Sequence, residues 1–98
     1  MTLRQKQSKF MSMLGALLHY ADQVGYEVTG GDLWALKNQG RKHSPNSKHY
    51  KRLAIDLNLF IDGKYQQSSR AHRPLGIFWE SIGGTWGGLK DGNHYELN

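Results

Sequence analysis

The chain has 98 residues, which is enough for one small domain and too few for two. It contains no cysteine, which excludes disulfides and cysteine-ligated zinc, so any metal site must use His, Asp and Glu. The 13 Lys and Arg residues outnumber the 8 acidic residues, giving a formal charge of +5. Such a charge favours a polyanionic partner: nucleic acid, anionic lipid or a cell-wall polymer. From the length of the chain, we expect residues 1–98 to form a single domain.

The first predicted element is a helix over residues 5–24, whose apolar side chains recur at intervals of three and four. These are Phe10, Leu14, Leu17, Leu18 and Ala21. We interpret the segment as a helix of the mature protein that covers a core and ends near Gly25. The alternative is a basic amphipathic helix that contacts membrane lipid. No segment reaches the roughly 18 apolar residues of a membrane span, so stable insertion is not expected.

Residues 26–32, "YEVTGGD", predict a short strand that closes at the glycine pair. Residues 35–50 are polar and carry Gly40 and Pro45, which is typical of a surface loop after a possible helical turn.

A second strand is predicted over residues 53–61, where Leu and Ile alternate with other residues at a period of two. A helix would leave Ile55 and Leu59 out of its apolar face. The run stops at "DGK" (62–64), a turn signal suited to a hairpin. This parity predicts that Asp56 projects from the face opposite the leucines.

The rest of the chain predicts a polar loop over 66–73, a short helix over 74–84 and extended segments at Trp86 and 95–97. Pro74 suits the first turn of that helix, and Gly83-Gly84 suit its end. The apolar face of the helix consists of Leu75, Phe78, Trp79 and Ile82. We therefore predict an α+β fold: a small antiparallel sheet packed with an N-terminal helix and a short second helix.

A metal site follows if the last strand pairs beside the 53–61 strand. Catalytic zinc usually keeps three protein ligands and one open position for water, and His49, Asp56 and His94 could provide that set. Hydrolysis also needs a general base. Asp91 is the candidate because the Gly92-Asn93 turn lets it converge with His94. Glu96 is the competing candidate, as the base or as a carboxylate behind the ligands.

The remaining histidines, His19, His43 and His72, have no carboxylate at a useful spacing, and we expect them to be structural or exposed.

Three segments, "SKHYKRLAIDL", "GGTWGG" and "DGNHYEL", resemble the zinc-dependent D-Ala-D-Ala carboxypeptidase and L-alanyl-D-glutamate endopeptidase family. The most similar type is the short single-domain form of bacteriophages, which often acts as an endolysin. The resemblance extends from "GYEVTGGDLW" through "HRPLGIFWESIGG" to the end of the chain. It implies a fold of the hedgehog/D-Ala-D-Ala peptidase type.

The resemblance also implies residue roles. His49, Asp56 and His94 match the zinc ligands, and Asp91 matches the catalytic acid/base. Ser47 matches a residue often placed beside the substrate. Trp86 is expected in the pocket wall, with a core tryptophan as the equal alternative.

One position departs from the family pattern. Relatives commonly carry an arginine shortly after the first strand, which polarises the scissile carbonyl or stabilises the oxyanion. Ala35 stands in that region, and the connection to the first ligand is shortened. Arg41, Lys37 or Arg52 could substitute, with Arg41 as the expected substrate-binding residue.

The resemblance implies a zinc metallopeptidase that cleaves the peptidoglycan stem peptide, as an endopeptidase or a carboxypeptidase. We expect a monomer, expressed by a phage in the host cytoplasm and acting at the periplasm or cell wall. One alternative is a catalytically weakened, zinc-binding module that binds the wall. Another is a basic nucleic-acid-binding domain, which the absence of a recognised motif disfavours.

Overall fold

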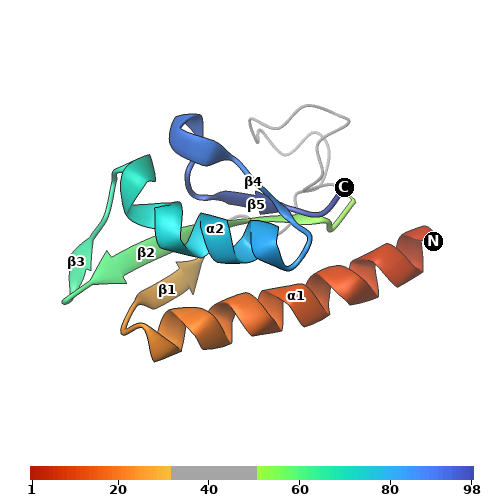
Figure 1. Ribbon diagram of the computed structural model, residues 1–98, viewed down its shortest axis with the longest axis horizontal. Coiled ribbons are helices and arrows are strands. Elements are labelled where there is room, and N and C mark those ends of the chain that lie inside the picture. The colour runs from red at the N-terminus through yellow and green to blue at the C-terminus, as the bar shows by residue number, and fades with distance from the viewer. Residues whose placement is uncertain (32–50) are drawn as a thin grey trace.

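The computed structural model of the chain describes residues 1–31 and 51–98. Its helices are α1 (Leu3–Gln23), α2 (Arg73–Ser81) and the short 3-10 helices η1 (Ser69–His72) and η2 (Gly88–Lys90). Its strands are β1 (Glu27–Gly30), β2 (Ala54–Ile61), β3 (Lys64–Tyr65), β4 (Thr85–Trp86) and β5 (His94–Glu96). The predicted α+β class is confirmed: an antiparallel sheet is packed with a long N-terminal helix and a short second helix (Figure 1).

Helix α1 forms where the apolar periodicity predicted it, and both of its ends are capped. Thr2 and Gln5 form a capping box at the N-terminus, each side chain accepting the other residue's backbone N–H. At the C-terminus, Gly25 adopts φ +82°, and the N–H groups of Gly25 and Tyr26 donate to the carbonyls of Asp22 and Ala21. This is the Schellman arrangement, for which glycine is suited because it lacks a Cβ. No described helix is long and apolar enough to cross a bilayer.

The sheet has the order β1-β2-β5-β4, and β3 pairs with the far end of β2. The hairpin between β2 and β3 turns at Asp62 and Gly63, both with positive φ, as a two-residue type I′ turn requires. The last strand pairs antiparallel beside β2, as the metal-site prediction requires. Figure 1 follows this arrangement, with β5 lying between β2 and β4.

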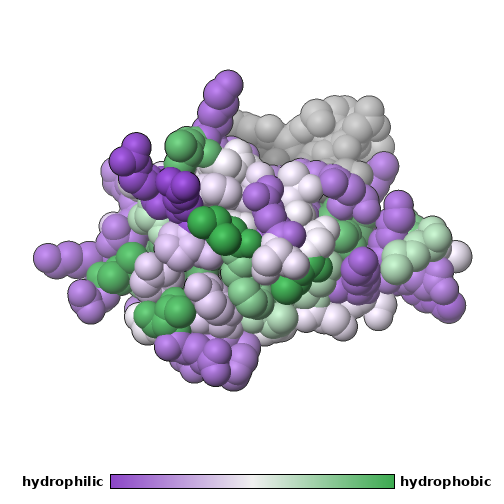
Figure 2. All heavy atoms as spheres, in the orientation of Figure 1, coloured by the Kyte–Doolittle hydropathy of each residue, from purple (hydrophilic) through white to green (hydrophobic). Residues whose placement is uncertain are grey.

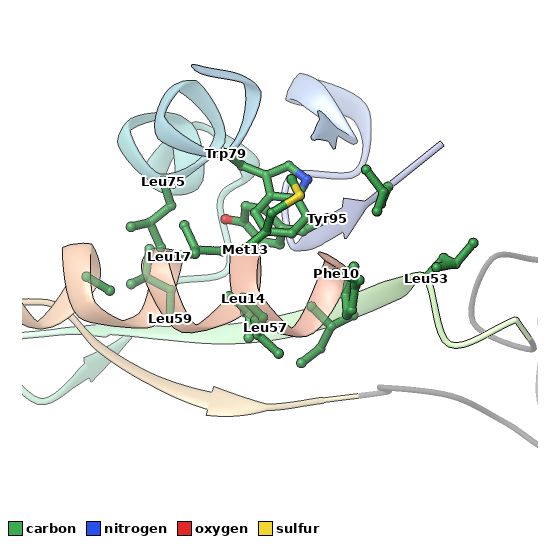
Figure 3. Packing of buried hydrophobic residues seen from close by; sticks show 13 residues of the cluster. Phe10, Met13, Leu14, Leu17, Leu53, Leu57, Leu59, Leu75, Trp79 and Tyr95 are labelled. Atoms are coloured by element: carbon green, nitrogen blue, oxygen red, sulfur yellow. The ribbon is translucent and has the colours of Figure 1, made fainter. Parts of the chain in front are cut away.

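The hydrophobic core lies between the helices and one face of the sheet (Figure 3). Strand β2 contributes its odd-numbered apolar residues to it, which confirms the predicted alternation. Helix α1 contributes Phe10, Met13, Leu14, Leu17 and Ala21, whereas Leu18, expected on the same face, is 40% exposed. Leu75, Trp79 and Tyr95 complete its centre.

One prediction needs correction: residues 66–73 are not simply a polar loop. Residues 69–72 form η1, and His72 at its end is buried. Nδ1 of His72 lies 2.8 Å from the hydroxyl of Tyr95, so the imidazole is a structural partner of the core. The alternation of polar and apolar residues gave no sign of this because the contact joins residues 23 positions apart.

The surface carries apolar side chains only as interspersed groups on the face drawn in Figure 2. Ile77 on α2 and Leu89 on η2 are more than half exposed. Isolated apolar residues of this kind are normal on soluble domains.

Candidate functional site

The pairing of β2 with β5 places three ionisable side chains on one face of the sheet. Asp56 is the register partner of His94, and Ala54 is the partner of Glu96. Directly paired residues project to the same face of a sheet, and alternate residues share it. Asp56, His94 and Glu96 therefore share the face opposite the core. Between them, Ile55 and Tyr95 form the pair that points into the core.

The imidazole of His94 lies between the two carboxylates. Its Nδ1 is 3.3 Å from Oδ1 of Asp56, and its Nε2 is 2.8 Å from Oε1 of Glu96. The exposed fractions of the side chains are 17% for His94, 22% for Asp56 and 23% for Glu96. The cluster is therefore partly shielded from water yet open to a solute.

The electrostatics of this cluster favour a cation. The hydrogen bond to Asp56 is the largest cause that raises the pKa of His94 to about 9, and Glu96 adds to it. Burial acts in the opposite direction, because it disfavours the charged imidazole. At neutral pH the metal-free imidazole is protonated and donates from both nitrogens.

The same geometry fits a zinc ion. Zinc ligands in tetrahedral coordination lie about 2.0–2.1 Å from the metal, which puts them about 3.3 Å from one another. Nδ1 of His94 and Oδ1 of Asp56 have that separation, so both can reach one ion. Within residues 1–31 and 51–98, no three His, Asp or Glu side chains are arranged so that all three could hold one metal ion. The third predicted ligand, His49, lies outside these residues.

The predicted turn before His94 is present. The N–H of His94 donates to the carbonyl of Asp91 at 3.1 Å, which closes a β-turn through Gly92 and Asn93. The first and fourth Cα atoms of such a turn lie within about 7 Å. Asp91 itself ends η2 and is exposed. Its side chain is therefore accessible to solvent next to the His94 strand.

Trp86 lies on the core side of the sheet. Its register partner is Tyr95, and it packs against the hydrophobic core. A Cβ added to Gly76 of α2 would come within 2.1 Å of the indole, so the ring lies directly on the helix backbone. The indole therefore packs against α2 and the core, and its expected place in a pocket wall stays a prediction.

Several residues singled out from the sequence lie outside the described residues. These are Ala35, Lys37, Arg41, His43, Ser47 and His49. The third proposed ligand and the two substrate-binding candidates Ser47 and Arg41 therefore stay predictions. Of the other histidines, His72 is structural and His19 is exposed on α1, as expected.

Comparison with protein families identifies the family to which the chain belongs. A family model described as D-alanyl-D-alanine carboxypeptidase matches residues 40–97, more than half of the chain. The chain belongs to the D-alanyl-D-alanine carboxypeptidase family. No curated protein and no solved structure matches significantly. Membership of this peptidase family makes hydrolysis of a peptide bond the coarse class of function.

The segment matched by the carboxypeptidase family contains every proposed ligand and Asp91. It begins after "GYEVTGGDLW" (25–34), which the sequence resemblance had included. One residue beside the site was missed at the sequence level: Ser69, whose hydroxyl accepts the N–H of Gly92 at 2.9 Å. No periodicity or spacing links residues that far apart.

Proposed function

We propose that the chain is a zinc-dependent peptidase that hydrolyses a peptide bond in the stem peptide of bacterial peptidoglycan. The observation that carries the proposal is the facing pair Asp56 and His94 on adjacent strands, inside the segment matched by the family. The positive formal charge suits an anionic cell wall. An endolysin role in a phage, with expression in the host cytoplasm and action at the wall, is part of this proposal.

The ion-binding residues in this proposal are His49, Asp56 and His94. Bound zinc would supply a Lewis acid that lowers the pKa of water and polarises a carbonyl. Glu96 accepts the Nε2–H of His94 and holds the ring so that Nδ1 faces Asp56. Carboxylates placed behind a ligating imidazole commonly fix its tautomer and orientation. This contact supports Glu96 as the orienting carboxylate and Asp91 as the proposed base.

Asp91 is the proposed proton carrier. Its carboxylate takes a proton from the water that attacks the scissile carbonyl. The new C–O bond forms, the C–N bond breaks, and the same proton passes to the leaving amine. A position directly before the ligand strand suits this task, because the turn keeps Asp91 close to His94.

Mass spectrometry of digested peptidoglycan tests the proposal. The zinc-loaded protein is expected to release fragments whose masses identify one cleaved stem-peptide bond. Asp91→Asn is expected to lower the rate by about a hundredfold or more, the usual contribution of general acid–base catalysis. Asp62→Asn is the matched control, because Asp62 is exposed in the β2–β3 turn, where asparagine also tolerates positive φ. Intact peptidoglycan after incubation with the zinc-loaded wild type would refute the peptidase.

A second candidate is a zinc-binding module that binds the wall without cutting it, motivated by Ala35 at the position of the family's arginine. For this module, sedimentation with insoluble peptidoglycan would be expected without any released fragment. Asp91→Asn would then bind as well as the wild type does.

A further inference from the structure

We infer that Ser69 and Trp86 are positioning residues that hold the Asp91–His94 turn by the backbone of Gly92. This inference rests on the proposed function, because it concerns how Asp91 is aimed at the ion-binding pair. The inference is based on two hydrogen bonds, which connect η1 and β4 to the turn before β5.

Both polar backbone groups of Gly92 are held by side chains. Its N–H donates to Oγ of Ser69 at 2.9 Å, and its carbonyl accepts the Nε1–H of Trp86 at 2.7 Å. Gly92 is buried, so neither group has water as an easy alternative. We call this pair of contacts the Gly92 clamp.

The neighbouring backbone groups are also paired. The N–H of Asp91 donates to the carbonyl of Gly88 at 3.3 Å, and its carbonyl accepts the N–H of His94 at 3.1 Å. All four backbone hydrogen-bonding groups of Asp91 and Gly92 therefore have a partner. The position of the Asp91 backbone is consequently determined by contacts outside the β2–β5 ladder as well as by His94.

Close packing restricts the clamp further. A Cβ added to Gly92 would lie 2.5 Å from Cα of Ser69, and one added to Gly87 would lie 2.1 Å from the carbonyl oxygen of Asp91. Both positions therefore require glycine, whose missing Cβ permits the close backbone approach. The indole of Trp86 is equally confined by Gly76. The turn has little room to shift while these contacts persist.

The ion-binding pair has further contacts besides the clamp, although β4, which carries Trp86, also pairs with β5. Asp56 and His94 are fixed by the β2–β5 ladder, and the N–H of Leu57 also donates to the carbonyl of Asn93 at 2.9 Å. Loss of the Ser69 hydroxyl would leave the buried N–H of Gly92 without a partner and release the turn on the Asp91 side. A proton carrier must stay within hydrogen-bonding reach, and a misplacement of about 1 Å can cost a hundredfold in rate.

The experiment compares Ser69→Ala, Ser69→Thr and Trp86→Phe in the zinc-loaded full chain. In Ser69→Ala we expect kcat to fall about tenfold to a hundredfold, with KM within about twofold and zinc content unchanged. Ser69→Thr keeps the hydroxyl and is expected to recover most of the rate. Trp86→Phe removes the indole donor together with part of the ring volume, and its kcat is expected to fall as in Ser69→Ala. Ser81→Ala is the matched control, because Ser81 is exposed and its hydroxyl donates to the carbonyl of Phe78 on α2.

Hydrogen exchange gives a second readout that does not depend on activity. The amide of Gly92 is expected to exchange at least about tenfold faster in Ser69→Ala, whereas the amide of Leu97, which donates to the carbonyl of Leu53 outside the turn, keeps its rate. An unchanged Gly92 amide would refute the clamp itself.

The outcomes separate this inference from the proposed function. An active wild type with an equally active Ser69→Ala variant overturns the positioning role and leaves the peptidase intact. A Ser69→Ala variant that loses rate only in proportion to lost zinc or lost folded protein also overturns it, because the contact is then merely structural. An inactive zinc-loaded wild type overturns the proposed function instead.

Discussion

The two faces of the β2–β5 pair are chemically opposite, one apolar and one ionisable, although alternate residues of the same two strands form them. On one face, Ile55 and Tyr95 are paired and buried under the helices. On the other face, Asp56 and His94 are paired and partly exposed, and the imidazole bridges two carboxylates. A period of two separates the residues that stabilise the sheet from the residues proposed to bind an ion.

Because the two faces alternate along the same strands, a chain of 98 residues can carry a candidate site without giving up its core. The backbone that orders the core face also fixes the spacing of the polar face. Two indole donors strengthen the region of β5: Trp79 donates to the carbonyl of Glu96 at 2.9 Å and Trp86 to that of Gly92 at 2.7 Å. His94 lies between these two fixed points. Substitutions on the two faces should therefore affect different observables.

The largest expected effect concerns the polar face. We expect His94→Ala to lower peptidoglycan cleavage by at least about a thousandfold, because a lost zinc ligand removes several kcal/mol of catalytic stabilisation. Bound zinc should fall in parallel, while the far-UV circular dichroism spectrum stays that of the wild type. His19→Ala is the matched control, because His19 is exposed on α1, and this variant should keep both activity and zinc. Full activity in His94→Ala would end the proposed role of this histidine.

The core face should respond in stability instead. Leu59→Ala removes a side chain that is 0% exposed, and we expect the free energy of unfolding to fall by about 2–5 kcal/mol. Asn58→Ala, on the adjacent position of β2, removes one partly exposed contact to Thr29 and should cost about 1 kcal/mol or less. Urea unfolding followed by tryptophan fluorescence measures both. Equal losses would contradict the division between the faces.

The buried pair of Tyr95 and His72 offers a sharper test of the core face. Tyr95→Phe keeps the ring but leaves His72 without its hydroxyl partner, so we expect a loss of about 1–3 kcal/mol in unfolding free energy. Tyr65→Phe is the control, because Tyr65 is 52% exposed. The same urea unfolding experiment applies, and an unchanged midpoint in Tyr95→Phe would show that the hydrogen bond adds no stability.

His72 also predicts a pH dependence of stability. Burial lowers the pKa of His72 below its usual 6.5, so the native state binds this proton less readily than the unfolded state does. The stabilising contribution is complete above pH 6.5 and is lost as the pH falls below it, by up to about 1.4 kcal/mol per pH unit. His72→Asn should lack this part of the slope, whereas His19→Asn should keep it. Identical pH profiles for His72→Asn and the wild type would contradict the buried neutral imidazole.

Much of the fold could be predicted because the apolar periodicity of each segment ends where the sequence carries turn residues. The three- and four-residue spacing from Phe10 to Ala21 gave α1, the alternation from Leu53 to Ile61 gave β2, and Asp62-Gly63 gave the hairpin. The contacts of His72 and Ser69 could not be predicted. Each depends on a tertiary approach between η1 and residues 92–95, which leaves no local pattern in the sequence.

The site was predicted in part for a related reason. The alternation of β2 predicted that Asp56 lies on the face opposite the leucines. The pairing of β5 with β2 makes His94 its direct neighbour on that face. Glu96 was expected on the side of His94, but its 2.8 Å contact with Nε2 could only come from the structure. The face of β4 that Trp86 occupies could not be predicted, because a two-residue strand is too short to show an alternation.

X-ray diffraction at the zinc absorption edge, from crystals grown with zinc, tests the central claim most directly. We predict one anomalous peak at coordination distance, about 2.0–2.2 Å, from Nδ1 of His94 and from a carboxylate oxygen of Asp56. A peak at any other place, or none between these two side chains in a zinc-saturated crystal, would contradict the account.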